Sequence, residues 1–266
     1  MPRKNLAQKT CRRCGSQING SHCTSCGLWN LPRNSVAGKL KTLADVTPAK
    51  ELATIACGRW GRMFSQKGEL VLGTLTAIGG SPGAGKSTLL LHMIAELEEK
   101  SIYVMAEEGE EPVKERADRL NVSIEKQRLV TSVLALGNED IELPATIITT
   151  KAKVLFIDSI SLLADDPSTA VEYCKALKVL SVKHNLATIL TVHVTKDGGI
   201  AGLMALQHVV DCTMTFFPDE TQPGVPRILH VEKNRNGKAY ISQIFLMKEK
   251  GLEIIGEHDA MAQLEH

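Results

Sequence analysis

Residues 74–91 read T-L-T-A-I-G-G-S-P-G-A-G-K-S-T-L-L-L, an apolar and β-branched run followed by a glycine-rich turn and a leucine-rich run. The turn places Gly80, Gly85, Lys86 and Ser87 at the spacing of a P-loop, G-x-x-x-x-G-K-S. The flanking runs predict a strand before the motif and a helix after it, which is the context that a P-loop requires. A glycine turn that binds nothing is the alternative, and both flanks argue against it.

The residue types of this motif suit the binding of a nucleoside triphosphate. Glycines let the backbone approach a phosphate and turn its N–H groups inward, while the positive end of the helix dipole points at the anion. Lys86 can reach the β- and γ-phosphates, and the Ser87 hydroxyl can bind Mg²⁺. We therefore expect ATP and Mg²⁺ as cofactors. The residues expected to hold the nucleotide are Gly80, Ser81, Pro82, Gly83, Ala84, Gly85, Lys86, Ser87 and Thr88.

Acidic residues follow two further apolar runs. Glu107 and Glu108 come directly after the run 101–106, and Asp158 ends the run Val154-Leu-Phe-Ile. In parallel sheets, ligands bind at the carboxyl ends of the strands. One glutamate is therefore expected to activate the attacking water, with Glu107 favoured over Glu108, and Asp158 is expected to hold Mg²⁺ as the Walker B residue. As alternatives, these acids could cap helices or serve as first-turn charges.

The order of the periodic runs predicts an α/β fold with a mostly parallel sheet and helices on both faces. From residue 209 onward, short strand-like runs predict antiparallel additions at one edge of the sheet, with an Asn-Gly pair at 236–237 favouring a hairpin. The expected helices are 88–97, 112–120, 139–150 and 168–184. The expected strands are 74–80, 101–106, 128–134, 154–158, 186–192, 209–217, 227–232, 242–247 and 252–255.

Four of the seven cysteines form two C-x-x-C pairs near the N-terminus, Cys11 with Cys14 and Cys23 with Cys26. Two such pairs can supply the four thiolates of a tetrahedral structural zinc site, with no position left open for water. A module this small has almost no core, so zinc would supply its folding energy. Disulfides are the alternative and fit poorly, because the sequence shows no export signal.

Composition is that of an ordinary globular chain, with 266 residues, 43% hydrophobic, 23% charged and a net charge of +1. The first 50 residues hold nine Lys and Arg against one acid, which favours contact with nucleic acid or an acidic partner over a merely solvated leader. No run approaches the roughly 18 apolar residues of a membrane span, so we expect a cytoplasmic protein without membrane contact. The expected domains are a four-cysteine zinc finger at 1–30, a linker at 31–56 and the ATPase domain at 57–266.

These motifs together resemble the RadA/Sms family of bacterial RecA-like recombination and repair ATPases, over about residues 10–256. The motifs that carry the resemblance are C-x-x-C-G … C-x-x-C-x-x-W-N at 11–30, I-G-G-S-P-G-A-G-K-S-T-L-L at 78–90, Tyr103-Val … Glu107-Glu108, Val113-Lys … Arg116-Ala-Asp-Arg-Leu120, Ile157-Asp-Ser-Ile160, His193-Val-Thr-Lys … Ile200-Ala-Gly202, Val210-Asp211 and Lys233-Asn-Arg-Asn-Gly237.

The resemblance implies a RecA-like P-loop core in an oligomeric ring, with DNA-stimulated ATP hydrolysis, single-stranded DNA binding and branch migration. It implies that Lys86, Ser87 and Thr88 bind nucleotide and Mg²⁺ and that Glu107 is the base. It places Lys196 in a loop facing a central DNA channel. Lys233 and Arg235 would contact DNA or act in trans at a subunit boundary, where their charge assists catalysis.

The sequence departs from the family pattern at a few points. Asn236 replaces the usual phenylalanine, Ser161 replaces a glutamine after Walker B, and the segment 162–168 is short. The chain ends at His266, where the family continues into a Lon-protease-like domain, so a compact form without that domain is expected. The alternatives are an ATP-gated adaptor for another recombinase or a replisome component, a DnaB-type replicative helicase, and a signalling ATPase of the KaiC kind.

Overall fold

The computed structural model describes residues 9–10, 14, 16–18, 52–122, 128–131, 143–162, 167–193 and 201–259. The chain divides into two compact units, Met1–Lys50 and Glu51–His266. In the first unit, strands β1 (Lys9–Thr10) and β2 (Gln17–Ile18) pair antiparallel and flank the first cysteine pair in the sequence. Cys14 is exposed, and the other three cysteines expected to bind zinc lie outside the described residues.

The second unit is built on a nine-stranded sheet within the described residues, in the order β13-β12-β11-β10-β5-β9-β8-β6-β7. The strands are β5 (Thr74–Gly80), β6 (Ser101–Met105), β7 (Arg128–Thr131), β8 (Val154–Asp158), β9 (Ala187–His193), β10 (Cys212–Pro218), β11 (Arg227–Asn234), β12 (Ile241–Lys248) and β13 (Gly251–Asp259). The strands from β10 to β7 run parallel to one another, and β11, β12 and β13 are added antiparallel.

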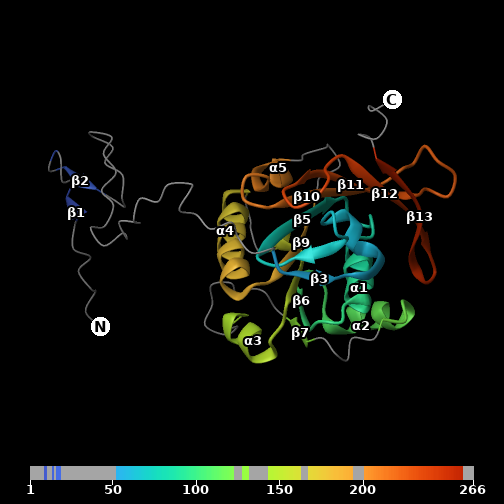
Figure 1. Ribbon diagram of the computed structural model, residues 1–266, viewed down its shortest axis with the longest axis horizontal. Helices are drawn as coiled ribbons and strands as arrows, with labels where there is room; N and C mark the ends of the chain where they lie inside the picture. Colours follow the sequence, from blue (N-terminus) through green and yellow to red (C-terminus); the bar gives the residue numbers. More distant parts are fainter. Residues whose placement is uncertain are drawn as a thin grey trace. The chain divides into compact units, whose positions relative to one another are not determined.

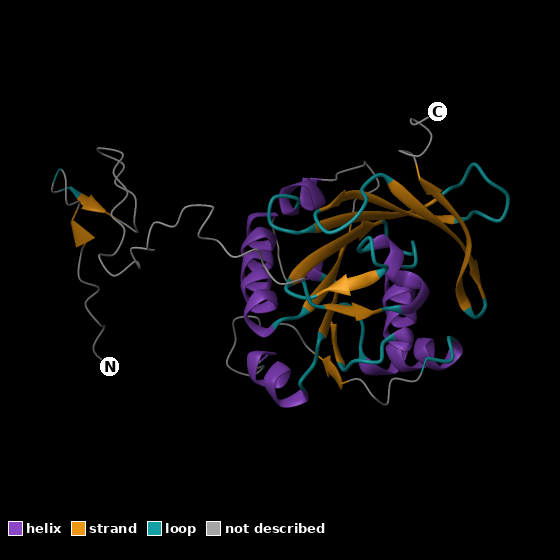
Figure 2. Cartoon of the chain, in the orientation of Figure 1, coloured by secondary structure: helices purple, strands orange, loops and turns teal. Residues whose placement is uncertain are grey.

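Helices cover both faces of this sheet, as Figures 1 and 2 show. They are α1 (Lys86–Glu96), α2 (Glu110–Arg119), α3 (Leu143–Thr150), α4 (Pro167–His184) and α5 (Ala201–Leu206). The apolar side chains of α1 and α2 join one core cluster, and those of α3, α4 and α5 join a second cluster. The central strands β6 and β8 are buried along their whole length because both of their faces are covered. The predicted α/β architecture is confirmed.

One strand runs in a different direction from the prediction. The sequence pattern predicts β10 as an antiparallel addition, but it pairs parallel with β5, with Cys212 opposite Thr76. Helix α5, which the periodicity does not reveal, precedes β10 and packs with α4 and beside β5 and β9. The chain therefore crosses back over the sheet before β10 begins, which is how a parallel neighbour is reached.

The start of the second unit also differs from the prediction. Strand β3 (Thr54–Ala56) pairs antiparallel with β4 (Glu69–Val71), and a 3-10 helix spans Gly58–Met63 between them. The expected linker at 31–56 therefore reaches into this unit, which begins at Glu51. Trp60 of the 3-10 helix stacks on Phe245 with ring centroids 5.8 Å apart, so this segment packs against the core. Among the described residues, no helix has the length and apolarity to cross a membrane.

Candidate active site

The P-loop connects the end of β5 to the start of α1, as the sequence predicts. A Cβ atom at Gly80 would lie 2.2 Å from the carbonyl oxygen of Phe216, so only glycine fits at this point. Gly85 has a φ of +109°, in the region that favours glycine, and a Cβ there would lie 2.8 Å from the terminal carbon of Met247. Within the described segment 52–122, no side chain caps the N-terminus of α1, so its first N–H groups remain available to an anion.

Lys86 is buried in the loop, with 5% of its surface exposed. Its ammonium donates hydrogen bonds to the carbonyl oxygens of Gly80 at 2.9 Å and Ser81 at 3.0 Å. Burial lowers the pKa of Lys86, and the nearby carboxylates of Asp158 and Glu107 partly offset that effect. A partly desolvated cation at the mouth of a P-loop suits the binding of phosphate oxygens.

Asp158 ends strand β8 and is also buried, with 5% of its surface exposed. Its Oδ1 accepts a hydrogen bond from the Thr191 hydroxyl and its Oδ2 accepts one from the Tyr103 hydroxyl, both at 2.6 Å. Burial, followed by the charge of Asp158, raises the pKa of Tyr103 well above 10, so its hydroxyl stays a donor. A carboxylate and the Ser87 hydroxyl are the kind of oxygen ligands that Mg²⁺ takes.

The structure separates the two candidate glutamates by their partners. Glu107 Oε2 lies 2.9 Å from His193 Nε2, which is at the end of β9. Glu108 forms a bidentate ion pair with the Arg116 guanidinium of α2, at 2.7 and 2.8 Å. The hydrogen bond to Glu108 is the main reason that the pKa of Arg116 is raised. In these contacts Glu108 is paired with a permanent cation, whereas the partner of Glu107 is a histidine ring.

Lys86, Glu107 and Glu108 line an open cavity of about 360 Å³, within the range of small-molecule sites, whereas the buried Asp158 is not among its lining residues. Its walls combine P-loop residues with both glutamates, and the remaining lining residues are Arg116, Arg119, His193 and Met247. The polar groups and the volume fit a nucleoside triphosphate. The sequence does not predict that Arg119 and Met247 line this cavity, because they come from α2 and β12, and their distance from the P-loop depends on the fold.

Lys233 and Arg235 lie at the other end of the sheet from the P-loop. Asn234 pairs with Cys212, which pairs with Thr76, so Asn234 lies level with a point four residues, or about 13 Å, before Gly80 along β5. The Lys233 ammonium donates to the carbonyl oxygens of Gln207 and, at 2.7 Å, Val210. The structure therefore does not bring these two cations to the cavity of their own chain.

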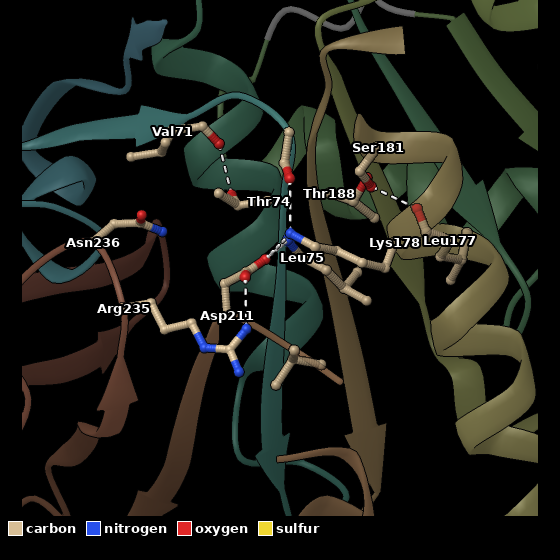
Figure 3. A network of polar contacts seen from close by, with 12 residues as sticks. Val71, Thr74, Leu75, Leu177, Lys178, Ser181, Thr188, Asp211, Arg235 and Asn236 are labelled. Carbon is tan, nitrogen blue, oxygen red and sulfur yellow. Dashed lines mark hydrogen bonds and ion pairs between the residues drawn. The ribbon is translucent and has the colours of Figure 1, made fainter. Parts of the chain in front are cut away.

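Arg235 belongs to a network centred on Asp211 (Figure 3). Asp211 Oδ2 accepts from the Leu75 backbone N–H at 2.9 Å and from the Lys178 ammonium of α4, and its Oδ1 lies 3.4 Å from Arg235 Nη1. Just over half of the Arg235 side chain stays exposed, so most of its donors remain available to another partner. Lys196 lies outside the described residues.

A P-loop between a central parallel strand and a helix, with a buried acid on a nearby strand, defines a RecA-like P-loop ATPase. The family model described as "ATPase: KaiC" matches residues 62–259. The chain belongs to this KaiC-type ATPase family.

Curated relatives refine this placement. The chain is 32% identical over 273 residues to the DNA repair protein RadA of Campylobacter jejuni, covering 94% of this chain and 60% of that protein. It is 32% identical over 281 residues to the DNA repair protein RadA of Bacillus subtilis, covering 94% and 59%. These matches confirm the resemblance to the RadA/Sms family, although the chain spans only about 60% of those relatives.

A solved structure shows the same fold. The KaiC-like protein PH0186 from Pyrococcus horikoshii OT3 superposes with a TM-score of 0.62 at 17% sequence identity. The match covers 77% of this chain and 100% of that chain.

Proposed function

We propose that this chain is a DNA-stimulated ATPase that binds single-stranded DNA and works as an oligomeric motor on recombination intermediates. The observation that carries the proposal is the convergence of Lys86, Ser87 and Glu107 on one cavity of nucleotide size. The similarity to DNA repair proteins named RadA supports the DNA part of the proposal. The basic composition of the first 50 residues is in keeping with contact to a polyanion.

In the proposed mechanism, the Lys86 ammonium exchanges its bonds to the Gly80 and Ser81 carbonyls for bonds to the β- and γ-phosphate oxygens. The N–H groups of the loop and of the α1 N-terminus bind the remaining phosphate oxygens. Ser87 and Asp158 would hold Mg²⁺, which supplies neutralisation of the charge that develops on the phosphates. Arg119 and Met247 would contact the nucleoside, because they line the cavity without belonging to the P-loop.

Glu107 is the proposed general base. It accepts a proton from the water that attacks the γ-phosphate, and its hydrogen bond with His193 fixes the direction of its carboxylate. Glu108 is unsuited to this role because both of its oxygens are occupied by Arg116. His193 directly precedes the segment that contains Lys196, so the base is connected along the chain to the proposed DNA-contacting loop.

Two further parts of the proposal concern assembly and zinc. Lys233 and Arg235 act on the nucleotide of a neighbouring subunit or contact DNA, since their position excludes their own cavity. Cys11, Cys14, Cys23 and Cys26 hold a structural zinc ion. The pairing of β1 with β2 supports this assignment, because the first cysteine pair lies between these two strands in the sequence.

A signalling ATPase of the KaiC kind is the second candidate, because the family model that matches is described as "ATPase: KaiC". The two candidates differ in their response to DNA. The test is the rate of ATP hydrolysis by the purified protein, with and without single-stranded DNA, at low and high salt. We expect stimulation that weakens steeply as salt rises, since phosphate contacts release counterions. Hydrolysis that is indifferent to DNA would contradict the motor and favour the signalling role.

A further inference from the structure

The carboxylate of Asp158 is held from both sides by neighbouring strands. β8 lies between β6 and β9 in the sheet, and each neighbour contributes one hydroxyl group to one carboxylate oxygen. Tyr103 and Thr191 are both fully buried, so neither hydroxyl has bulk water as an alternative partner. The two donors therefore restrict Asp158 to one orientation.

The strand register explains why these two residue types reach Asp158. Ile157 pairs with Leu190, which places Thr191 directly beside Asp158. Tyr103 pairs with Phe156, one strand period before Asp158, so both side chains project from the same face of the sheet. A phenol ring is long enough to carry its hydroxyl across that period, and a shorter residue at 103 would fall short.

Each oxygen of an ionised carboxylate has about two acceptor sites. The hydroxyls of Tyr103 and Thr191 occupy one site on each oxygen of Asp158, which leaves one site on each oxygen for the cation. We propose that Tyr103 and Thr191 are positioning residues that orient Asp158 for Mg²⁺. This inference rests on the proposed function, in which Asp158 holds the cation.

The competing explanation is that the two hydroxyls only satisfy a buried carboxylate and stabilise the fold. Both explanations predict that removing a hydroxyl lowers stability. Only the positioning role predicts a change in the Mg²⁺ concentration that nucleotide binding requires, because groups behind a metal ligand typically change metal affinity by about tenfold or more.

The test is the equilibrium binding of a non-hydrolysable ATP analogue to the full chain, titrated with Mg²⁺ and repeated in EDTA. We expect Tyr103→Phe and Thr191→Val each to raise the half-saturating Mg²⁺ concentration roughly tenfold, with unchanged affinity in EDTA. Thr191→Ser keeps the hydroxyl and should restore the wild-type Mg²⁺ requirement. Thr188→Val is the matched control, because its buried hydroxyl on the same strand bonds to Ser181 instead.

The outcomes separate the two explanations. If Tyr103→Phe, Thr191→Val and Thr188→Val all lose thermal stability and none of them changes the Mg²⁺ requirement, the positioning role is overturned. Asp158→Asn sets the reference for a lost cation ligand, and an unchanged Mg²⁺ requirement in that variant would refute the assignment of Asp158 itself. Absence of any nucleotide binding by the wild-type chain would instead contradict the proposed function.

Discussion

At the level of single residues, adjacent glutamates differ because their partners differ. Glu108 is tied to Arg116 by two hydrogen bonds, whereas Glu107 contacts the ring of His193 and lines the cavity. A general base must be able to accept a proton from water, and a carboxylate in a bidentate pair with arginine holds a proton poorly. The sequence motif alone places both residues at the right strand end without separating them.

This difference gives a prediction for a matched pair of variants. Glu107→Gln should reduce the rate of ATP hydrolysis by about 10²–10⁴, the usual contribution of a general base, while nucleotide binding persists. Glu108→Gln should reduce the rate far less, and it should lower stability slightly through its lost pair with Arg116. Steady-state hydrolysis and ATP-analogue binding check both. A larger loss of hydrolysis in Glu108→Gln would reverse the assignment of the base.

At the level of helices and strands, Asp211 joins three elements at the end of the sheet away from the cavity. Its carboxylate bonds to the Leu75 backbone N–H in β5, to Lys178 of α4 and to Arg235 after β11 (Figure 3). The Asp211 side chain is 9% exposed, so its pair with Lys178 is poorly screened by solvent. Removing one partner of such a pair leaves a charge without compensation.

We therefore predict that Asp211→Asn lowers the free energy of unfolding by about 2–4 kcal/mol. The matched control is Glu172→Gln, which breaks the exposed pair of Glu172 with Lys175 on α4 and should cost about 0.5 kcal/mol or less. Urea denaturation of the two variants measures both values. Equal small losses would show that the Asp211 network does not hold these elements together.

His92 connects α1 to β13 and gives the fold a pH dependence. Its Nε2 accepts a hydrogen bond from the Leu252 N–H at 3.0 Å, and its ring stacks on Trp60. Burial lowers the pKa of His92 below its ordinary value of 6.5, and Arg59 lowers it further. The unfolded chain then binds more protons than the folded one as pH falls through 6.5, so the stabilising effect is complete above pH 6.5 and is lost below it.

The corresponding prediction is a loss of stability between about pH 7.5 and 5.5 that depends partly on His92. His92→Leu removes the titrating group and should make the free energy of unfolding less dependent on pH over this interval. His208→Gln, at an exposed histidine, serves as the control and should keep the wild-type dependence. Denaturant titrations at about pH 7.5 and 5.5 measure the free energy of unfolding at each pH. If this free energy depends on pH as strongly in His92→Leu as in the wild-type protein, the role of the His92 contact is refuted.

The sequence predicts the bounds of those helices and strands whose pattern of apolar residues is strong. β5, β8 and α4 match their expected bounds within one residue, because continuous apolar runs and long amphipathic patterns are local signals. The strand order, the direction of β10 and the pairing of β3 with β4 depend on contacts between distant segments. The P-loop, Glu107 and Asp158 follow apolar runs that predict strands, and the structure places them at strand ends as expected. The contacts of Tyr103 and Thr191 with Asp158, and the positions of Arg119 and Met247 in the cavity wall, depend on the fold and could not be predicted from local pattern.

At the level of the whole molecule, the cavity beside the P-loop and Arg235 lie at opposite ends of the parallel strands. A site that needs both can be completed only when one copy presents its Arg235 end to the cavity of the next copy. Such a head-to-tail contact is heterologous, and it closes into a ring when the rotation per subunit permits. The geometry is thus compatible with the proposed oligomer, in which subunits would share catalysis.

Mixing two inactive variants tests this sharing. Lys86→Ala removes the cavity's cation, and Arg235→Ala removes the proposed donor to the neighbour, so each alone should hydrolyse little ATP. In an equal mixture that exchanges at random around a ring, about a quarter of the sites combine an intact cavity with an intact neighbour, so activity should return to about that fraction. No recovery in mixed oligomers would contradict an action of Arg235 in trans.

The proposed function requires above all that the loop from Gly80 to Ser87 binds a triphosphate through Lys86. The direct measurement is the equilibrium affinity of the folded wild-type protein and of Lys86→Ala for ATP with Mg²⁺. We predict saturable binding by the wild-type protein and an affinity at least about tenfold weaker in Lys86→Ala. Equal affinity in the two proteins, or no binding by the folded wild-type protein, would contradict it.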